Sequence, residues 1–310
     1  MILTVTLNAA IDKRYVLDRF VPGEVNRVKE CSYSAGGKGL NVARVAAIAG
    51  EEVCATGFVG GHAGSYIKEE LQRQGIRSDF VHIKGESRSC INIYDEASKS
   101  QTEILEPGAP VTQSDLEQML QKYRQLIKEC NLVAISGSVP AGADAGIYVQ
   151  MIEIARHHGI RVIVDTSGRL LEEAIKSRPY MIKPNIDEIR MLTGKAMDSR
   201  EELLEAAMQL YQSGIELVVV SCGGEGSLIV SREGVYRAVP PRVELVNTVG
   251  CGDSLVAGFA VGLCRQMPIE ETIKLATAIS AANAMRVETG YYRPEDLQVL
   301  LPLVKLERLK

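Results

Sequence analysis

Several residue types and patterns are absent or scarce in the 310-residue chain, and each absence narrows its function. Tryptophan is absent and only four phenylalanines occur, which leaves few rings for stacking on nucleic acid bases. The formal net charge is -4, with acids and bases interspersed, so we expect no basic surface for nucleic acid. No apolar run approaches the length that spans a membrane, and we expect no membrane partner.

The cysteines and the first residues indicate a protein of the cytosol. The seven cysteines are scattered, without a CxxC pair and without a zinc-like spacing to histidine. Free thiols fit a reducing compartment. The opening residues, MILTVTLNAAIDKRY, reach a charge too soon for a secretory signal. We therefore expect a cytoplasmic protein.

The order of apolar runs and helical patterns predicts an α/β fold. Five short runs have the length and composition of buried parallel strands. They are Ile2–Leu7, Leu132–Ser136, Arg161–Asp165, Tyr180–Lys183 and Glu216–Ser221. Apolar residues at helical spacing predict helices in residues 42–49, 116–126, 253–266 and 269–287. This alternation predicts a doubly wound, mostly parallel sheet with helices on both faces.

Two stretches depart from this pattern. Residues 12–34 and 87–106 are polar-alternating and rich in β-forming residues, with no intervening helix. We expect them to form a small β-sheet lid over the sugar site of a core made of residues 1–11, 35–86 and 107–310. An exposed sheet of this kind could pair with that of a second chain, which predicts a homodimer through the lid. No internal repeat or low-complexity tract divides the chain further.

A glycine-rich turn, NTVGCGDS at residues 247–254, is the sharpest chemical signal. It precedes the apolar helical pattern LVAGFAVGL. Glycines let the backbone approach a ligand closely, and the unpaired N–H groups of a helix N-terminus attract phosphate. Asp253 could there accept a proton from an attacking hydroxyl group, as phosphoryl transfer requires. It could equally be only a helix cap, and the turn alone does not separate the two.

Three other turns offer groups suited to a ligand. Residues 36–39 (GGKG) are not a P-loop, because Leu40 follows them, and they could form an ordinary strand-to-helix turn. At the end of a strand, Lys183 could neutralise a phosphate, while Asn185 and Glu188 offer oxygens to a hydrated Mg²⁺. Glu188 could also be an exposed helix residue. Residues 221–226 (SCGGEG) fit either a nucleotide loop or a hairpin.

Together, three of these segments resemble the signatures of the PfkB-type, ribokinase-like carbohydrate kinases. They are Gly36–Ala43, Lys183–Glu188 and Gly250–Asp253, and the resemblance runs from Leu3 to about Gly290. It implies the ribokinase-like fold and an ATP-dependent phosphotransferase that uses ATP and Mg²⁺. A dinucleotide-dependent dehydrogenase is disfavoured, because residues 8–12 (NAAID) replace GxGxxG after the first strand.

The resemblance also implies roles for individual residues. The catalytic group has Asp253 as base and the amides of Gly250, Cys251 and Gly252 as part of the anion hole. The sugar phosphate is expected to contact Asp12, Arg27, Gly37, Lys38, Asn41, Arg88 and Ser138. The nucleotide is expected to contact Lys183, Asn185, Ser221, Gly223, Gly224, Gly226, Thr248 and Asn283. Asn185 and Glu188 are expected to serve the metal.

Two arginines in the lid segments indicate a phosphorylated substrate. The guanidinium group of Arg27 or Arg88 could form a bidentate contact with a phosphate. Either residue could equally be an ordinary surface arginine. The resemblance is nearest to the branch of tagatose-6-phosphate kinases and 1-phosphofructokinases. We therefore expect a ketohexose phosphate as substrate, tagatose 6-phosphate first and fructose 1-phosphate as the alternative. A non-catalytic regulator that binds a sugar phosphate is the alternative of another class, and the presence of Asp253 argues against it.

Cys251 departs from the family, in which many members have alanine beside the proposed base. A helix N-terminus can lower the pKa of a thiol. We therefore expect alkylation of Cys251 to inhibit the enzyme, with Cys222 as the next candidate.

Overall fold

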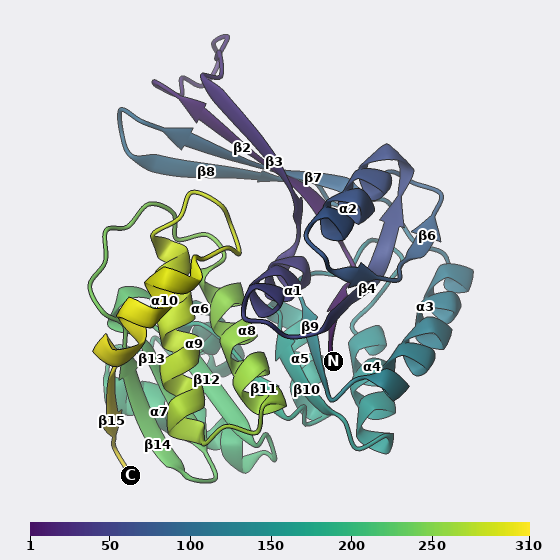
Figure 1. Ribbon diagram of the computed structural model, residues 1–310. Helices are drawn as coiled ribbons and strands as arrows, with labels where there is room; N and C mark the ends of the chain where they lie inside the picture. Colours follow the sequence, from purple (N-terminus) through teal and green to yellow (C-terminus); the bar gives the residue numbers. More distant parts are fainter.

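Two β-sheets of unequal size organise the computed structural model, which describes residues 1–310 (Figure 1). The large sheet has eleven strands in the order β15-β14-β13-β12-β11-β10-β9-β1-β4-β5, with β6 paired to β4. Its members are β1 (Ile2–Thr6), β4 (Val53–Gly60), β5 (Arg77–Ser78), β6 (Val81–Ile83), β9 (Leu132–Ser136), β10 (Arg161–Asp165), β11 (Met181–Ile182), β12 (Leu217–Ser221), β13 (Ser227–Ser231), β14 (Gly234–Val239) and β15 (Lys305–Arg308). All pairings are parallel except those of β13, β14 and β15, which form an antiparallel edge.

Helices cover both faces of the large sheet, as expected for a doubly wound fold. The α-helices are α1 (Lys38–Ile48), α2 (Gly61–Arg73), α3 (Gln113–Leu126), α4 (Gly146–His157), α5 (Gly168–Lys176), α6 (Ile186–Thr193), α7 (Arg200–Gln212), α8 (Cys251–Cys264), α9 (Ile269–Ala284) and α10 (Pro294–Leu300). Short 3₁₀ helices lie at Ile127–Glu129, Gly223–Glu225 and Leu301–Leu303. None of the helices combines the length and hydropathy needed to cross a membrane.

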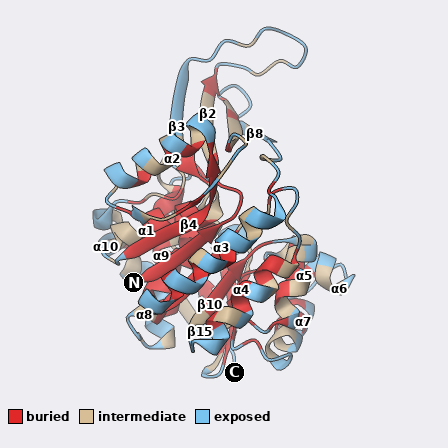
Figure 2. Cartoon of the chain, turned by 90° about the vertical axis from the view of Figure 1, so that its right-hand side faces the viewer, coloured by how far each residue is buried: buried red, intermediate tan, exposed pale blue.

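Alternate strand residues contribute to two separate hydrophobic clusters, one on each face. Ile2 joins the cluster with α1, α8 and α9, whereas Leu3 joins the cluster with α3, α4 and α7. The central strands β1, β4 and β9 are buried along their whole length, whereas the outward faces of the helices are exposed (Figure 2). The continuous apolar composition of the strands follows from this burial on both faces.

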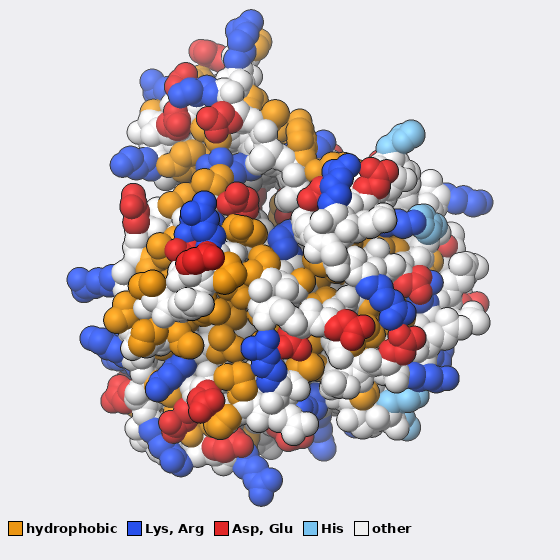
Figure 3. Space-filling model, viewed as in Figure 1, with side chains coloured by type: hydrophobic (Ala, Val, Ile, Leu, Met, Phe, Trp, Pro, Cys, Tyr) orange, Lys and Arg blue, Asp and Glu red, His pale blue; other side chains and the backbone are white.

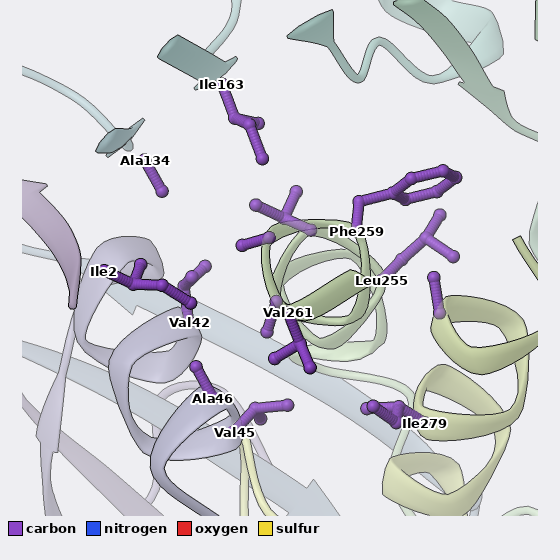
Figure 4. Packing of buried hydrophobic residues seen from close by; sticks show 14 of the residues in the cluster. Ile2, Val42, Val45, Ala46, Ala134, Ile163, Leu255, Phe259, Val261 and Ile279 are labelled. Carbon is purple, nitrogen blue, oxygen red and sulfur yellow. The ribbon is translucent and has the colours of Figure 1, made fainter. Parts of the chain in front are cut away.

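The packing of α1 against α8 and α9 fixes the place where α8 begins. Val45 on α1, Val261 on α8 and Ile279 on α9 are buried in one cluster, and their side chains lie between the three helices (Figure 4). Helix α8 is buried on nearly every side, in agreement with its almost uninterrupted apolar sequence. Because this packing holds the whole of α8 in place, its first turn has a fixed position at the carboxyl ends of the parallel strands.

The small sheet has four strands in the order β3-β2-β7-β8 and projects from the body (Figure 1). Its strands are β2 (Ala10–Leu17), β3 (Glu30–Gly36), β7 (Arg88–Asp95) and β8 (Ser100–Leu105). The strands begin at Ala10 rather than at residue 12, and β3 ends at Gly36 rather than at residue 34. The predicted α/β class, the mostly parallel sheet and the separate small sheet are confirmed.

Candidate active site

A cleft of about 750 Å³, here called the central cleft, opens at the carboxyl ends of the parallel strands and below the small sheet. Lys, Arg, Asp and Glu side chains are interspersed over the surface around it (Figure 3). The expected site residues that line it are Asp12, Gly37, Lys38, Asn41, Arg88, Ser138, Lys183, Asn185, Ser221, Gly250, Gly252 and Asp253. Those that do not line it are Arg27, Glu188, Gly223, Gly224, Gly226, Thr248, Cys251 and Asn283.

Asp253 lies in the first turn of α8 and is 7% exposed. Gly250 precedes the helix with φ of +82°, and a Cβ atom there would lie 2.8 Å from the backbone nitrogen of Gly290. Burial raises the pKa of Asp253, partly opposed by the charge of Lys38. A carboxylate with a raised pKa is a better proton acceptor than one in water.

Asp165 is a site residue that the sequence did not single out. It ends β10, is fully buried, and lies 3.2 Å from the Nζ atoms of both Lys38 and Lys183. Burial would raise the pKa of Asp165, but the charges of Lys183 and Lys38 outweigh it and lower the pKa. The charge of Asp165 in turn raises the pKa of Lys38. One carboxylate therefore forms ion pairs with two lysines and favours the charged form of Lys38. Its position at a strand end was the only available sequence signal.

Asp12 lies on β2 at the base of the small sheet, where the chain comes closest to Gly36 on β3. A Cβ atom at residue 36 would overlap the carboxylate of Asp12, so only glycine fits there. Burial raises the pKa of Asp12 to about 6, and the charge of Arg44 opposes this shift. The buried Arg44 donates to the backbone oxygen of Thr289 over 3.0 Å and also to that of Ala35. Arg44 was not among the expected residues, although it follows the GGKGLNVA segment directly.

Arg88 and Ser138 meet around Asn8 at one end of the central cleft. Arg88 donates from Nε to the backbone oxygen of Asn8 (3.0 Å) and from Nη1 to that of Glu106 (3.1 Å). The side-chain amide of Asn8 donates to Oγ of Ser138 over 3.2 Å. Arg27, by contrast, is exposed in the loop of residues 18–29, away from the central cleft of its own chain.

Asn185 and Glu188 satisfy each other at the start of α6. Oδ1 of Asn185 accepts from the backbone N–H of Glu188, and Oε2 of Glu188 accepts from that of Asn185, both at 2.8 Å. This capping box uses one oxygen of each side chain. No group of three or more His, Cys, Asp or Glu side chains is arranged to hold a metal ion directly. The remaining oxygens fit a hydrated Mg²⁺ whose other ligands are water and phosphate.

The glycine segment after β12 leaves open space beside its backbone. Gly223 has φ of +57°, and no atom lies within 4 Å of a Cβ built on Gly223 or Gly224. The amide of Cys222 donates to the backbone oxygen of Gly226 over 2.8 Å, which closes the turn. A flat ligand can therefore approach this backbone without displacing side chains.

Asn283, which was expected near the adenine, does not line the central cleft. It is fully buried on α9, accepts hydrogen bonds from Oγ of Ser254 and the amide of Tyr291, and donates to the backbone oxygen of Val249. Its amide is used to hold the turn before α8, and none of it reaches the cleft. Its Nδ2 also contacts Sγ of Cys251 at 3.4 Å.

The expected activation of Cys251 is not supported. Burial raises the pKa of the Cys251 thiol, although the side chain of Asn283 opposes this shift. At neutral pH the thiol is therefore protonated, because burial and the charge of Asp253 both disfavour the thiolate.

The fold and this arrangement define a carbohydrate kinase of the ribokinase-like class. Residues 5–296 match the pfkB family of carbohydrate kinases, and the chain belongs to that family. A tagatose-6-phosphate kinase from Staphylococcus epidermidis is 40% identical over 309 residues, which are 99% of each chain.

Solved structures agree with this assignment. Phosphofructokinase-2 from Escherichia coli, in complex with potassium, has a TM-score of 0.90 and 29% identity over 97% of this chain and 98% of its own. A Thermotoga maritima protein described as a possible 1-phosphofructokinase has a TM-score of 0.88 and 30% identity over 100% of both chains. Ribokinase from Thermotoga maritima shares the fold, with a TM-score of 0.81 at 22% identity, over 97% of this chain and 99% of its own.

Proposed function

We propose that the protein transfers the terminal phosphoryl group of ATP to a hydroxyl group of a ketohexose phosphate and so forms a ketohexose bisphosphate. The observation that carries this proposal is the position of Asp253. Its buried carboxylate lies at the N-terminus of α8, in the same cleft as Asp12 and Arg88. A proton acceptor, an anion-binding helix end and a cation for a second phosphate are thus within one cleft.

In this mechanism Asp253 takes the proton of the attacking hydroxyl group. A bond forms between the hydroxyl oxygen and the terminal phosphorus of ATP, and the bond from that phosphorus to ADP breaks. The backbone N–H groups from Gly250 to Asp253 stabilise the negative charge of the migrating group, which is the main catalytic requirement of phosphoryl transfer. Lys38 and Lys183, both paired with Asp165, supply positive charge to the same cleft.

Mg²⁺, when bound with ATP, neutralises phosphate charge, and Asn185 and Glu188 would hold its water shell. The glycines of residues 223–226 would admit the nucleotide close to the backbone, with Ser221 and Thr248 beside it. Lys183 is 5% exposed and would meet the phosphates at the floor of the cleft. These assignments account for the nucleotide side of the cleft without Asn283.

On the sugar side, Asp12 would accept hydrogen bonds from two hydroxyl groups, and Gly37 and Lys38 would lie beside them. Arg88 and Ser138 would bind the phosphate that the sugar already carries. One N–H of the Asn41 side chain donates to Oδ2 of Asp253 and would orient its carboxylate. The second N–H would donate to the sugar. Among ketohexose phosphates we favour tagatose 6-phosphate, because the relative named for that substrate aligns along nearly the whole chain. Fructose 1-phosphate is the second candidate, favoured by the similar Thermotoga maritima structure.

The small sheet would cover the bound sugar as a lid and would also form a homodimer. It exposes apolar side chains, among them Tyr33 (50% exposed) and Ile104 (49%). One relative, phosphofructokinase-2 of Escherichia coli, is described as tetrameric in an inhibited form. Arg27 lies outside the cleft of its own chain, so its expected contact with phosphate requires either a second chain or movement of residues 18–29. Light scattering tests the dimer, and a monomer at working concentration contradicts it.

The test of the proposed function is ATP consumption with Mg²⁺ against tagatose 6-phosphate, fructose 1-phosphate, fructose 6-phosphate and unphosphorylated fructose. We expect one phosphosugar to give the highest kcat/KM and fructose to be poor. If none of them supports turnover while ATP and a phosphosugar still bind, the protein is a regulator or uses another acceptor.

A further inference from the structure

Arg14 lies on the inner face of the small sheet, one step farther out than Asp12. Residues two apart on a strand point to the same face. In the pairing of β2 with β7, Asp12 lies opposite Cys90 and Arg14 lies opposite Asn92. All four of these residues line the central cleft. The strand that carries the sugar-binding Asp12 therefore also presents a guanidinium group to the same space.

The donors of Arg14 and Asn92 have no acceptors in the protein. Arg14 makes no hydrogen bond or ion pair, and its buried Nε is without a partner. Nδ2 of the neighbouring Asn92 is likewise buried without an acceptor. The guanidinium group of Arg14 lies over the ring of Tyr94, 5.3 Å from its centroid, which orients the group without using its N–H donors. Glu103, opposite Asn92 on β8, also lines the central cleft, but it is exposed and forms no ion pair with Arg14.

The other two arginines that line the central cleft have hydrogen-bond acceptors in the protein. Arg44 and Arg88 both donate to backbone oxygens. Buried donors are nearly always satisfied, and the exceptions call for a ligand or a functional explanation. Two unsatisfied donors side by side, one of them charged, match the oxygens of a phosphate group.

The position of Arg14 indicates which phosphate. Along the inner face, Arg88 lies on the body side of Asp12 and Arg14 on the opposite side. Beyond Arg14, Gln101 on β8 donates to Oδ1 of Asn247 over 3.3 Å, which joins the small sheet to the glycine-rich turn. A sugar held by Asp12 thus has one arginine on each side along the strands, and Arg14 lies between Asp12 and the position of Gln101, which contacts Asn247 in the turn before α8.

We propose that Arg14 and Asn92 form a second oxyanion subsite, which receives the phosphoryl group as it is transferred and holds it as the second phosphate of the bisphosphate product. This inference rests on the proposed function. It adds a binding element on the small sheet to those supplied by the body. The same phosphate chemistry could come from the monophosphate substrate or from ATP, and the experiment separates these sources.

The experiment compares Arg14→Gln and Arg14→Lys with the parent and with Arg19→Gln, which removes an exposed arginine just beyond the end of β2. Calorimetry measures binding of tagatose 1,6-bisphosphate, fructose 1,6-bisphosphate and the two corresponding monophosphates, and kinetics give the KM for ATP. For the bisphosphate of the preferred sugar we expect Arg14→Gln to raise the Kd about 10-fold, because a charged two-pronged contact is lost. Monophosphate binding and the KM for ATP should stay within about twofold of the parent. The lysine variant should recover part of the affinity, and Arg19→Gln should match the parent.

Other outcomes overturn the assignment. Equal weakening of monophosphate and bisphosphate would place the phosphate of the substrate at Arg14, and a change confined to the KM for ATP would place a nucleotide phosphate there. Unchanged binding of all ligands would show that Arg14 and Asn92 form no anion subsite. If the parent consumes no ATP with any phosphosugar but binds the bisphosphate through Arg14, the subsite stands and the proposed function fails.

Discussion

The side-chain amide of Asn41 donates a hydrogen bond of 2.8 Å to Oδ2 of Asp253, and so joins α1 to the first turn of α8. Arg44 donates from Nη1 to Oδ1 of Asn41 over 3.1 Å, which fixes the orientation of the amide because guanidinium groups only donate. The packing of α1 against α8 holds both helices in place. The orientation of the Asp253 carboxylate is thus set by the hydrophobic core and by the hydrogen-bonded chain of Arg44, Asn41 and Asp253.

Asp253→Asn should abolish most activity without loss of stability. We expect kcat/KM to fall about 10²–10⁴-fold, the range for loss of a general base. The pKa of Asp253 is raised in the folded state, so ionisation costs stability at every pH above that pKa. Asparagine removes this cost, and the free energy of unfolding at pH 7 should be equal to or above that of the parent. Its advantage should shrink as the pH falls toward about 4, the usual pKa of aspartate.

Urea unfolding and steady-state kinetics on the same preparation check this prediction. Asn41→Ala is the matched control, because it leaves the carboxylate but removes its neutral donor. Turnover near the parent's in Asp253→Asn would remove Asp253 as the base. A marked drop in stability would instead give it a structural role.

Asp165→Asn should destabilise the protein and also change the pH dependence of catalysis. The pKa of Asp165 is lowered in the folded state, so its ion pairs stabilise the fold above about pH 4, and this contribution is lost as the pH falls through the lowered pKa. Removing the carboxylate leaves Lys183 and Lys38 without their partner, for which we expect about 3–5 kcal/mol of lost stability at pH 7. The charge of Asp165 also raises the pKa of Asp253, so the acid limb of kcat/KM should move to lower pH.

The pH profile distinguishes positioning from a purely structural role. A variant that is only less well folded would lose activity at every pH without moving the acid limb. Asp79→Asn is a suitable comparison, since it removes another carboxylate paired with a lysine, Lys122, at a partly exposed position away from the central cleft. An unmoved acid limb in Asp165→Asn would contradict the electrostatic link to Asp253.

The affinity for the sugar phosphate should weaken as the pH falls through about 6. Burial raises the pKa of Asp12 to this value, so below it the carboxylate is protonated and loses part of its capacity to accept hydrogen bonds from hydroxyl groups. We expect the KM for the sugar to rise severalfold between pH 7 and pH 5, while the KM for ATP changes little. Asp12→Asn should have a high KM that varies over this interval only through the titration of the sugar's own phosphate, whose second pKa is about 6. A KM that is independent of pH in the parent would exclude Asp12 as a titrating sugar ligand.

The strands of the fold could be predicted well because burial on both faces leaves a strong pattern. Leu132–Ser136 and Arg161–Asp165 were predicted with the bounds that β9 and β10 have. Tyr180–Lys183 was predicted too long, since only Met181 and Ile182 pair. The sequence alone could not assign strand order, because it depends on which crossovers pack together rather than on the composition of any strand.

The site could be predicted only where a motif is contiguous. The segments around Asn41, Asn185 and Asp253 each contain their own signal, and the structure brings residues from all three to one cleft. Asp165 and Arg14 could not be predicted as site residues, because their surroundings come from residues distant in the sequence. Asp165 pairs with Lys38 and Lys183, and Arg14 lies beside Asn92 and Tyr94. The burial of Asn283 behind the turn before α8 could not be predicted, because an amide on a helix gives no indication of which side it faces.

Alkylation of Cys251 should be slow at pH 7 and should accelerate only under alkaline conditions. Burial raises the pKa of this thiol, and thiol reagents react with the thiolate. Cys31 is exposed and should react first, without effect on activity. If slow alkylation of Cys251 inactivates the parent, this inactivation should be absent in Cys251→Ala. If that variant is inactivated as fast as the parent, Cys222 or another thiol is responsible.

Arg88→Ala should chiefly raise the KM for the phosphosugar. Arg88 donates to the backbone oxygens of Asn8 and Glu106, so truncation removes both the proposed phosphate contact and the links from β7 to the turn after β1 and to the end of β8. We expect the KM to rise about 10–100-fold, corresponding to the loss of one charge-assisted contact with phosphate. Arg88→Lys separates the two contributions, because it keeps the charge but cannot bridge two oxygens in the same plane. If both variants bind unphosphorylated fructose as the parent does but lose the phosphosugar, Arg88 recognises the phosphate. If both lose fructose equally, Arg88 shapes the cleft through Asn8 instead, and the phosphate must be held by other groups.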